Sequence, residues 1–190
     1  MRLGDHFQQI KKKYHNTFFS GICFDHRKIK KNYIFFAIKG NNLDGNNFIP
    51  SVIKKGCKII VTEKNFDELK SGVLFINTKN IRKLLAQISF SIFKKKPNNL
   101  IAVTGTNGKS SVSDFYYQIL NLNNKKVASI GTLGVRSNNF NLNLLNTTVD
   151  PISVGKILTE LKKRKIENVI MEASSHGLHQ NRLDGLLFNS

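Results

Sequence analysis

A glycine-bracketed turn, TGTNGKS at Thr104–Ser110, carries residue types that bind phosphate groups. Glycines let backbone N–H groups turn inward, and a helix that begins directly after the turn adds unpaired N–H groups and a partial positive charge. Lys109 is placed to reach the β- and γ-phosphates of a nucleotide, and the Ser110 hydroxyl to ligate the Mg²⁺ that bridges them. The sequence therefore predicts a site for the phosphates of a nucleotide, formed by Thr104, Gly105, Thr106, Asn107, Gly108, Lys109, Ser110 and Ser111.

The elements that must position this turn are readable on both sides of it. Leu100–Thr104 is a run of aliphatic and β-branched residues, typical of a strand buried on both faces. After the turn, apolar residues recur at helical spacing from Val112 to Leu120. The common P-loop pattern GxxxxGK[ST] is not met, because Val103 stands at its first glycine. An ordinary strand–helix turn is the alternative, but it does not account for the lysine and hydroxyl that follow Gly108.

A second candidate ligand lies at the end of another apolar run, NVIMEA at Asn168–Ala173. In doubly wound sheets ligands bind beyond the carboxyl ends of the strands, so Glu172 is expected at the same edge as the glycine turn. A lone carboxylate at the end of a buried strand is costly unless it is paired or bound to a metal. We predict that Glu172 and Ser110 ligate Mg²⁺; a structural salt bridge is the alternative for Glu172.

The composition of the chain argues against several classes of protein. The 190 residues include 30 Lys and Arg against 12 Asp and Glu, a formal charge of +18. The basic residues are spread along the chain and are not interleaved with aromatic residues, so a nucleic-acid-binding protein is the less favoured alternative. The chain has no 18-residue apolar run, and Cys23 and Cys57 form no metal-binding or disulfide pattern. We expect a cytoplasmic protein without a nucleic-acid partner and without a membrane span.

Alternating strand and helix patterns predict an α/β protein. Strands are expected at 18–24, 33–38, 58–62, 73–77, 100–104, 126–130 and 168–173. Helices are expected at 1–15, at 48–55, at 81–93, directly after the glycine turn and from Asp150-Pro151 onward. The charged, proline-broken segment 94–99 is the best domain boundary, so we predict one domain at 1–97 and another at 98–190.

Taken in order along the whole chain, these pieces resemble the Mur ligases. FDHRKIKKNYIFFAIKGNNLDGNNFIPSVIKKG is similar to a domain in which a D-S-R motif precedes a strand, a G-x-x-x-D-G turn and a helix. TGTNGKS resembles the family's ATP loop. NTTVDP (146–151) and MEASSHGLHQNR (171–182) resemble the branch that adds the third amino acid to the peptidoglycan precursor. His26 departs from the pattern, which has serine at that position.

The resemblance implies an ATP-dependent amide ligase of peptidoglycan precursor synthesis. ATP would phosphorylate the terminal carboxylate of UDP-MurNAc-L-Ala-D-Glu, and the amine of the incoming residue would displace phosphate from the acyl phosphate. Lys109 and Glu172 would be the catalytic residues. The added residue would be meso-diaminopimelate, because it is the commoner choice in this family; lysine is the alternative. A ligase like folylpolyglutamate synthase, which shares the ATP loop, is the rival reading.

The resemblance also implies the architecture. A small N-terminal α/β UDP-binding domain would be followed by a truncated P-loop-type domain that binds ATP on a parallel sheet. The C-terminal domain that binds the incoming amino acid would be absent, so the chain would be an inactive N-terminal fragment of a protein that is monomeric at full length.

By the same resemblance, a set of aromatic and polar residues would bind the UDP-MurNAc-dipeptide. They are Phe24 and His26 beside the uridine, Asn41, Asn42 and Leu43 at the nucleotide-sugar, and Asn146, Thr147, Thr148, Ser174, Gln180 and Arg182 at the muramoyl-peptide end. The planar fork of Arg182 suits a carboxylate or a phosphate, because it can donate two parallel hydrogen bonds.

Overall fold

The computed structural model describes residues 1–8 and 10–189. The chain divides into two compact units, Met1–Ile88 and Ser89–Ser190. Each unit contains a mostly parallel sheet, which confirms the predicted α/β class. The domain boundary after residue 97 stays a prediction. Within the described residues, no helix is long and apolar enough to cross a membrane.

The first unit is built on a five-stranded sheet with the order β1-β2-β3-β5-β4. Its strands are β1 (Gly21–Cys23), β2 (Tyr33–Phe36), β3 (Ile59–Thr62), β4 (Leu69–Lys70) and β5 (Val73–Asn77). All neighbours are parallel except β4, which pairs antiparallel to β5. The short 3-10 helix η3 (Gly45–Phe48) leads into α1 (Ile49–Lys54), whose Ile49 and Val52 join the core with Phe35 and Ile60.

The helix predicted at 1–15 is wrong. This segment forms two short 3-10 helices, η1 (Leu3–Asp5) and η2 (Lys12–Tyr14). The backbone N–H of Leu3 donates to the carbonyl of Thr17, and that of Gly4 donates to the carbonyl of His15. The helical spacing of the apolar residues in this segment therefore did not predict its structure. The backbone N–H groups of Leu3 and Gly4 bond to carbonyls at Thr17 and His15, not to carbonyls one helical turn away.

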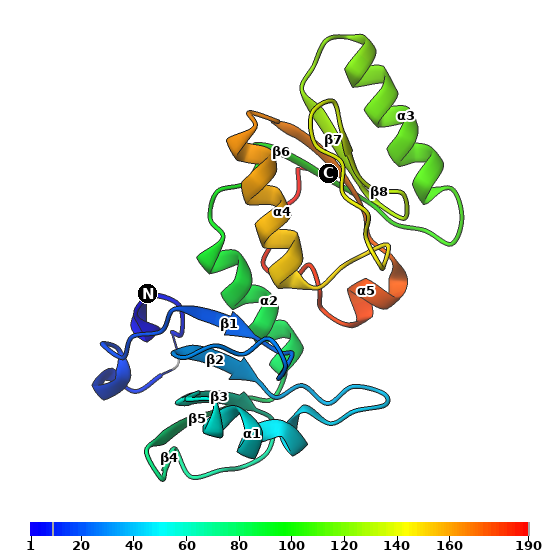
Figure 1. Cartoon of the computed structure of the whole chain (residues 1–190). Helices are drawn as coiled ribbons and strands as arrows, with labels where there is room; N and C mark the ends of the chain where they lie inside the picture. The colour runs from blue at the N-terminus through cyan, green and yellow to red at the C-terminus, as the bar shows by residue number, and fades with distance from the viewer. Residues whose placement is uncertain (9, 190) are drawn as a thin grey trace. The chain divides into compact units, whose positions relative to one another are not determined.

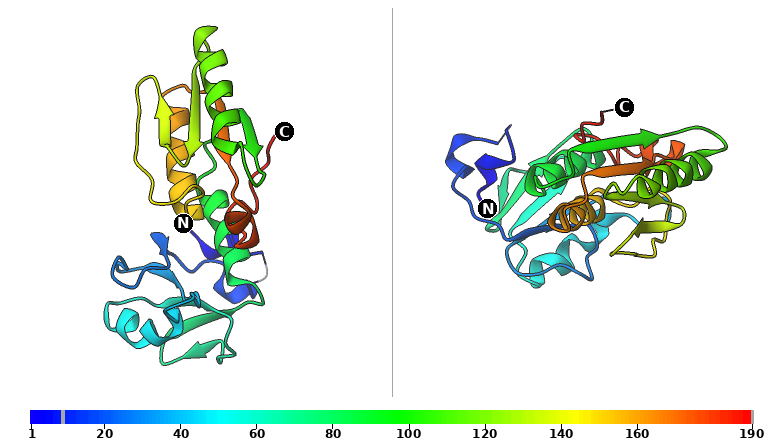
Figure 2. Two further views of the ribbon diagram at one scale, coloured as in Figure 1. Left: turned by 90° about the vertical axis from the view of Figure 1, so that its right-hand side faces the viewer. Right: turned by 90° about the horizontal axis from the view of Figure 1, so that it is seen from above.

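The second unit is built on a four-stranded sheet with the order β6-β9-β7-β8. Its strands are β6 (Asn99–Val103), β7 (Val127–Gly131), β8 (Gly134–Ser137) and β9 (Asn168–Glu172). β6, β9 and β7 are parallel, and β8 returns antiparallel to β7. Although far apart in the sequence, β6 and β9 run side by side, as Figures 1 and 2 show.

Helices flank the strands of the second unit. The division between the two units falls within α2 (Ile81–Ile92), which precedes β6, and the short α5 (Ser175–His179) follows β9. α3 (Lys109–Leu122) and α4 (Pro151–Lys163) lie on opposite faces of the sheet (Figure 1). α4 begins as predicted, because the Asp150 side chain accepts a hydrogen bond from the Ser153 N–H at 3.0 Å and Pro151 occupies the first turn.

The core of the second unit lies between α4 and the sheet. Val154, Ile157, Leu158 and Leu161 of α4 are buried together with sheet residues that include Ala128. Because three strands are parallel, their carboxyl ends meet at one edge, and the register sets Val103 opposite Glu172. The turns that follow β6, β7 and β9 therefore share that edge.

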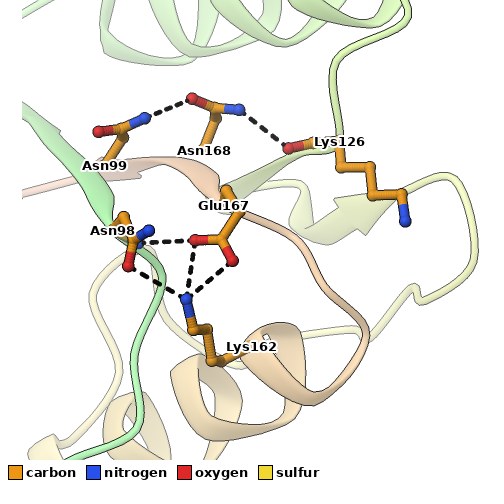
Figure 3. Close-up of polar contacts among 6 residues, drawn as sticks. All are labelled: Asn98, Asn99, Lys126, Lys162, Glu167 and Asn168. Carbon is orange, nitrogen blue, oxygen red and sulfur yellow. Dashed lines mark hydrogen bonds and ion pairs between the residues drawn. The ribbon is translucent and has the colours of Figure 1, made fainter.

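The amino ends of the same strands are joined by a polar cluster (Figure 3). Lys162 Nζ donates to both carboxylate oxygens of Glu167, at 2.8 and 2.9 Å, and to Asn98 Oδ1 at 3.1 Å. The Asn99 side chain donates to Asn168 Oδ1 at 2.9 Å. These contacts tie α4 and the start of β9 to the start of β6, at the end of the sheet remote from the glycine turn.

The Lys162–Glu167 pair makes stability depend on pH. The hydrogen bond from Lys162, aided by the backbone N–H of Asn98, holds the pKa of Glu167 below its ordinary value of 4.5. A carboxyl whose native pKa is lowered stabilises the fold above its ordinary pKa, and this contribution is lost as the pH falls through the native pKa. We expect Glu167→Gln to lower the urea midpoint at about pH 7 more than at about pH 2. An equal difference at both pH values, measured by circular dichroism, would contradict this.

Candidate functional site

The predicted phosphate turn joins β6 to α3. Residues 104–108 of the turn are exposed. Gly108 has a φ of +79°, a left-handed conformation that L side chains rarely adopt, and α3 begins at the next residue, Lys109. Lys109 Nζ donates to the carbonyl oxygens of Gly105 at 2.7 Å and Thr106 at 3.3 Å. The turn thus combines the N-terminal N–H groups of a helix with a nearby ammonium group, an arrangement that can bind phosphate.

Ser110 and Glu172 meet at the carboxyl edge of the sheet. Ser110 Oγ donates a hydrogen bond to Glu172 Oε2 at 3.0 Å. Glu172 is only 3% exposed. Within the described residues, its carboxylate accepts hydrogen bonds from hydroxyl and backbone N–H groups and forms no ion pair with a lysine or arginine. The structure therefore brings the two residues together, as the parallel sheet led us to expect, and gives no support to a structural salt bridge.

The spacing of these two oxygens suits a hard cation. Oxygens at neighbouring corners of a Mg²⁺ octahedron, each about 2.1 Å from the metal, lie roughly 3.0 Å apart. Ser110 Oγ and Glu172 Oε2 are 3.0 Å apart. No group of three or more His, Cys, Asp or Glu side chains gathers among the described residues. A metal at this position would therefore need phosphate oxygens or water to complete its shell, as is usual for Mg²⁺ in nucleotide sites.

Thr132, which the sequence analysis did not single out, also contacts this carboxylate. It follows β7 directly, and its N–H donates to Glu172 Oε1 at 3.2 Å while its hydroxyl donates to Oε2 at 3.0 Å. Gly131, the last residue of β7, leaves the room that the carboxylate occupies, because a Cβ there would overlap it. The rule that singled out Glu172 could have found both residues, since they too lie where an apolar parallel strand ends.

We expect Gly131→Ala to displace the Glu172 side chain and to lower the free energy of unfolding by about 1–3 kcal/mol, the usual cost of overpacking. The loss should be smaller when Gly131→Ala is made in a Glu172→Ala background, because the added methyl group then meets no carboxylate. Urea denaturation of the four proteins gives the coupling. Strictly additive effects would contradict the overlap.

The residues predicted at the muramoyl-peptide end form a second group on this edge. Thr148 Oγ1 donates to the backbone carbonyl of Glu172 at 2.9 Å and accepts from the Ser174 N–H at 3.0 Å. Arg182 donates to the carbonyl of Thr148, and it donates to Gln180 Oε1 at 2.7 and 3.1 Å. Thr147 Oγ1 lies 3.0 Å from Thr132 Oγ1, and Asn146, one residue earlier, is exposed. The structure thus brings Thr147, Thr148, Ser174, Gln180 and Arg182 together.

The residues predicted at the uridine and the sugar belong to the first unit. Phe24 and the turn residues Asn41, Asn42 and Leu43 are exposed. His26 is half-buried, and its ring stacks on Phe48 with centroids 3.7 Å apart and planes 5° apart. A serine at this position could not form that stack, so His26 has a packing contact of its own.

Between Phe24 and His26, Asp25 is fixed by Arg27. The guanidinium donates to both carboxylate oxygens at 2.9 Å. These hydrogen bonds lower the pKa of Asp25 to about 2. The pair therefore favours the ionised form of Asp25, which lies between Phe24 and His26.

Two family models match this chain. Residues 19–91 match the model described as "Mur ligase family, catalytic domain", and residues 103–190 match "Mur ligase middle domain". A Rickettsia conorii protein named UDP-N-acetylmuramoyl-L-alanyl-D-glutamate--2,6-diaminopimelate ligase is 41% identical over 180 residues. The match covers 92% of this chain and 36% of that protein. The chain thus spans about a third of the length of the curated relatives it matches.

Solved structures show the same likeness. The structure of a UDP-N-acetylmuramoyl-L-alanyl-D-glutamate--2,6-diaminopimelate ligase matches with a TM-score of 0.81 at 25% identity, over 98% of this chain and 39% of that one. A MurF ligase from Thermotoga maritima, solved in complex with ADP, matches with a TM-score of 0.50 at 19% identity, over 81% of this chain and 32% of that one. The second match concerns the fold alone.

Proposed function

The chain belongs to the Mur ligase family, whose N-terminal and middle domains it carries, and from this premise we propose that it is part of an ATP-dependent ligase. The proposed reaction adds meso-diaminopimelate to UDP-MurNAc-L-Ala-D-Glu. The relatives named for that activity, which are about 40% identical over most of this chain, support this choice of substrates. The observation that carries the ATP-dependent step is the meeting of Ser110 and Glu172 beside the glycine turn.

The reaction needs a carboxylate to become a good electrophile. The γ-phosphoryl group of ATP passes to the terminal carboxylate of the dipeptide, the amine of the incoming residue attacks the acyl phosphate, and phosphate leaves. No protein nucleophile takes part, so positioning and charge neutralisation are what the chain must supply. Mg²⁺, when bound, neutralises charge on the β- and γ-phosphates.

We assign these tasks to residues of the carboxyl edge. Ser110 and Glu172 would hold the metal, and Lys109 would leave the carbonyls of Gly105 and Thr106 to bind phosphate oxygens. Arg182 is pre-oriented by Gln180 and would bind a carboxylate of the substrate through its fork.

The remaining assignments belong to the same proposal. Thr147, Thr148 and Ser174 would contact the muramoyl-peptide end, and Phe24 with the turn at 41–43 would contact the nucleotide-sugar. We place the reaction in the cytoplasm, where reducing conditions keep Cys23 and Cys57 as thiols.

Calorimetry with the purified chain tests the proposal. We expect UDP-MurNAc-L-Ala-D-Glu and Mg²⁺-ATP to bind, and a reduced folate not to bind. Binding of the folate in place of the UDP-sugar would favour a ligase like folylpolyglutamate synthase. Binding of duplex DNA with a steep salt dependence, together with no binding of ATP, would instead identify the +18 charge as a nucleic-acid surface.

A further inference from the structure

Thr132 lies between the two groups of residues at the carboxyl edge. It is exposed in the turn between β7 and β8, yet it contacts the buried Glu172. On its other side, its hydroxyl oxygen lies 3.0 Å from Thr147 Oγ1. One side chain therefore touches both the carboxylate proposed to hold Mg²⁺ and a threonine proposed to contact the muramoyl-peptide.

The directions of these hydrogen bonds follow from the number of protons available. A threonine hydroxyl carries one proton, and an ionised carboxylate can only accept. The Thr132 proton is therefore directed to Glu172 Oε2, and the bond to Thr147 must be donated by Thr147. The chain of bonds runs from Thr147 through Thr132 to Glu172.

The carboxylate is fixed on several sides by these contacts. The Thr132 N–H holds Oε1, and the Thr132 and Ser110 hydroxyls both donate to Oε2. Beside it, the missing side chain at Gly131 leaves the space that the carboxylate occupies. If a cation takes the place of the Ser110 proton at Oε2, the two bonds from Thr132 can persist and keep that oxygen aimed at the metal.

We propose that Thr132 is a positioning residue that orients Glu172 for Mg²⁺ and links it to Thr147. This inference rests on the proposed function, since it assigns Glu172 to the metal. Partners of this kind hold a ligand in the right orientation, and their loss costs about 10- to 100-fold in metal affinity. Thr132 does not itself touch the reacting groups.

The test is the Mg²⁺ dependence of ATP binding, measured by calorimetry on the purified chain. Thr132→Val keeps the shape of the side chain and removes the hydroxyl, so the Mg²⁺ concentration for half-maximal ATP binding should rise about 10-fold. Thr132→Ser keeps the hydroxyl and should stay close to the wild-type value. Thr159→Val is the matched control, because the Thr159 hydroxyl donates to the Gly155 carbonyl within α4 at 2.9 Å.

The possible outcomes distinguish the role of Thr132 from the proposed function of the chain. A wild-type chain that binds ATP with Mg²⁺, and a Thr132→Val variant with the same Mg²⁺ requirement, would overturn the role of Thr132 alone. A Thr132→Ser variant as impaired as Thr132→Val would also overturn it, since the hydroxyl would then not be the cause. A wild-type chain with no Mg²⁺-dependent ATP binding would overturn the proposed function, and the role of Thr132 with it. Thermal melts of all variants, followed by circular dichroism, identify any loss of folding.

Discussion

Glu172→Gln should weaken the Mg²⁺-dependent binding of ATP by about 10- to 100-fold, which corresponds to the loss of a charge-assisted contact of roughly 1.5–3 kcal/mol. Glutamine has nearly the shape of glutamate, and its amide oxygen can still accept from Ser110 or Thr132. What it lacks is the negative charge of the carboxylate, which attracts Mg²⁺ more strongly than a neutral amide oxygen does. Without Mg²⁺ the weak binding of ATP should change little. Calorimetry with and without Mg²⁺ measures both quantities.

The matched control is Glu167→Gln, five residues earlier in the chain. Glu167 precedes β9 at the opposite end of the sheet, where Lys162 binds it (Figure 3). The two variants change the net charge equally, so they separate a local ligand effect from a general effect of charge on a chain of +18. Equal Mg²⁺ responses of the two variants would contradict a metal-binding role for Glu172.

In the proposed role of Lys109, its ammonium group would contact phosphate oxygens directly, so Lys109→Ala should weaken ATP binding by about 10- to 100-fold whether or not Mg²⁺ is present. This pattern differs from that of Glu172→Gln, whose effect should appear only with the metal. The fold should be unaffected, since among the residues that the structure describes the Lys109 ammonium group donates only to exposed carbonyls of the turn, at Gly105 and Thr106, which water can satisfy.

Lys125→Ala is the control for this second prediction. Lys125 is exposed just beyond the other end of α3, so its removal lowers the net charge by the same amount without touching the turn. At one ionic strength, its ATP affinity should match that of the wild type. If both variants lose affinity equally, the glycine turn has no special role, and diffuse positive charge accounts for the binding.

Much of the carboxyl edge could be predicted from the sequence, because its logic is local. A buried strand that ends in a glycine turn and a helix fixes where Lys109 and Ser110 stand. A second apolar strand that ends in Glu172 must share that edge once the sheet is parallel. The α/β pattern alone was enough to predict that Ser110 and Glu172 lie close together.

The parts that were missed depend on contacts between distant segments. The N-terminal segment has helical spacing, but its backbone pairs with residues 15–17, which the spacing cannot reveal. β8 is a short return strand beside β7 with no clear apolar alternation. Thr132 is exposed and has an ordinary residue type, so its place at a strand end marks it only as a candidate, and its two hydrogen bonds to the carboxylate show only in the structure. Such roles are set by tertiary contacts and not by local pattern.

The most direct measurement is a crystal structure of this chain with Mg²⁺ and a non-hydrolysable ATP analogue. The account predicts phosphate groups at residues 105–110 and a metal about 2.1 Å from both Ser110 Oγ and a Glu172 oxygen, with the Thr132 hydroxyl still bonded to that carboxylate. A nucleotide bound elsewhere, or a Mg²⁺ whose ligands include neither Ser110 nor Glu172, would contradict it.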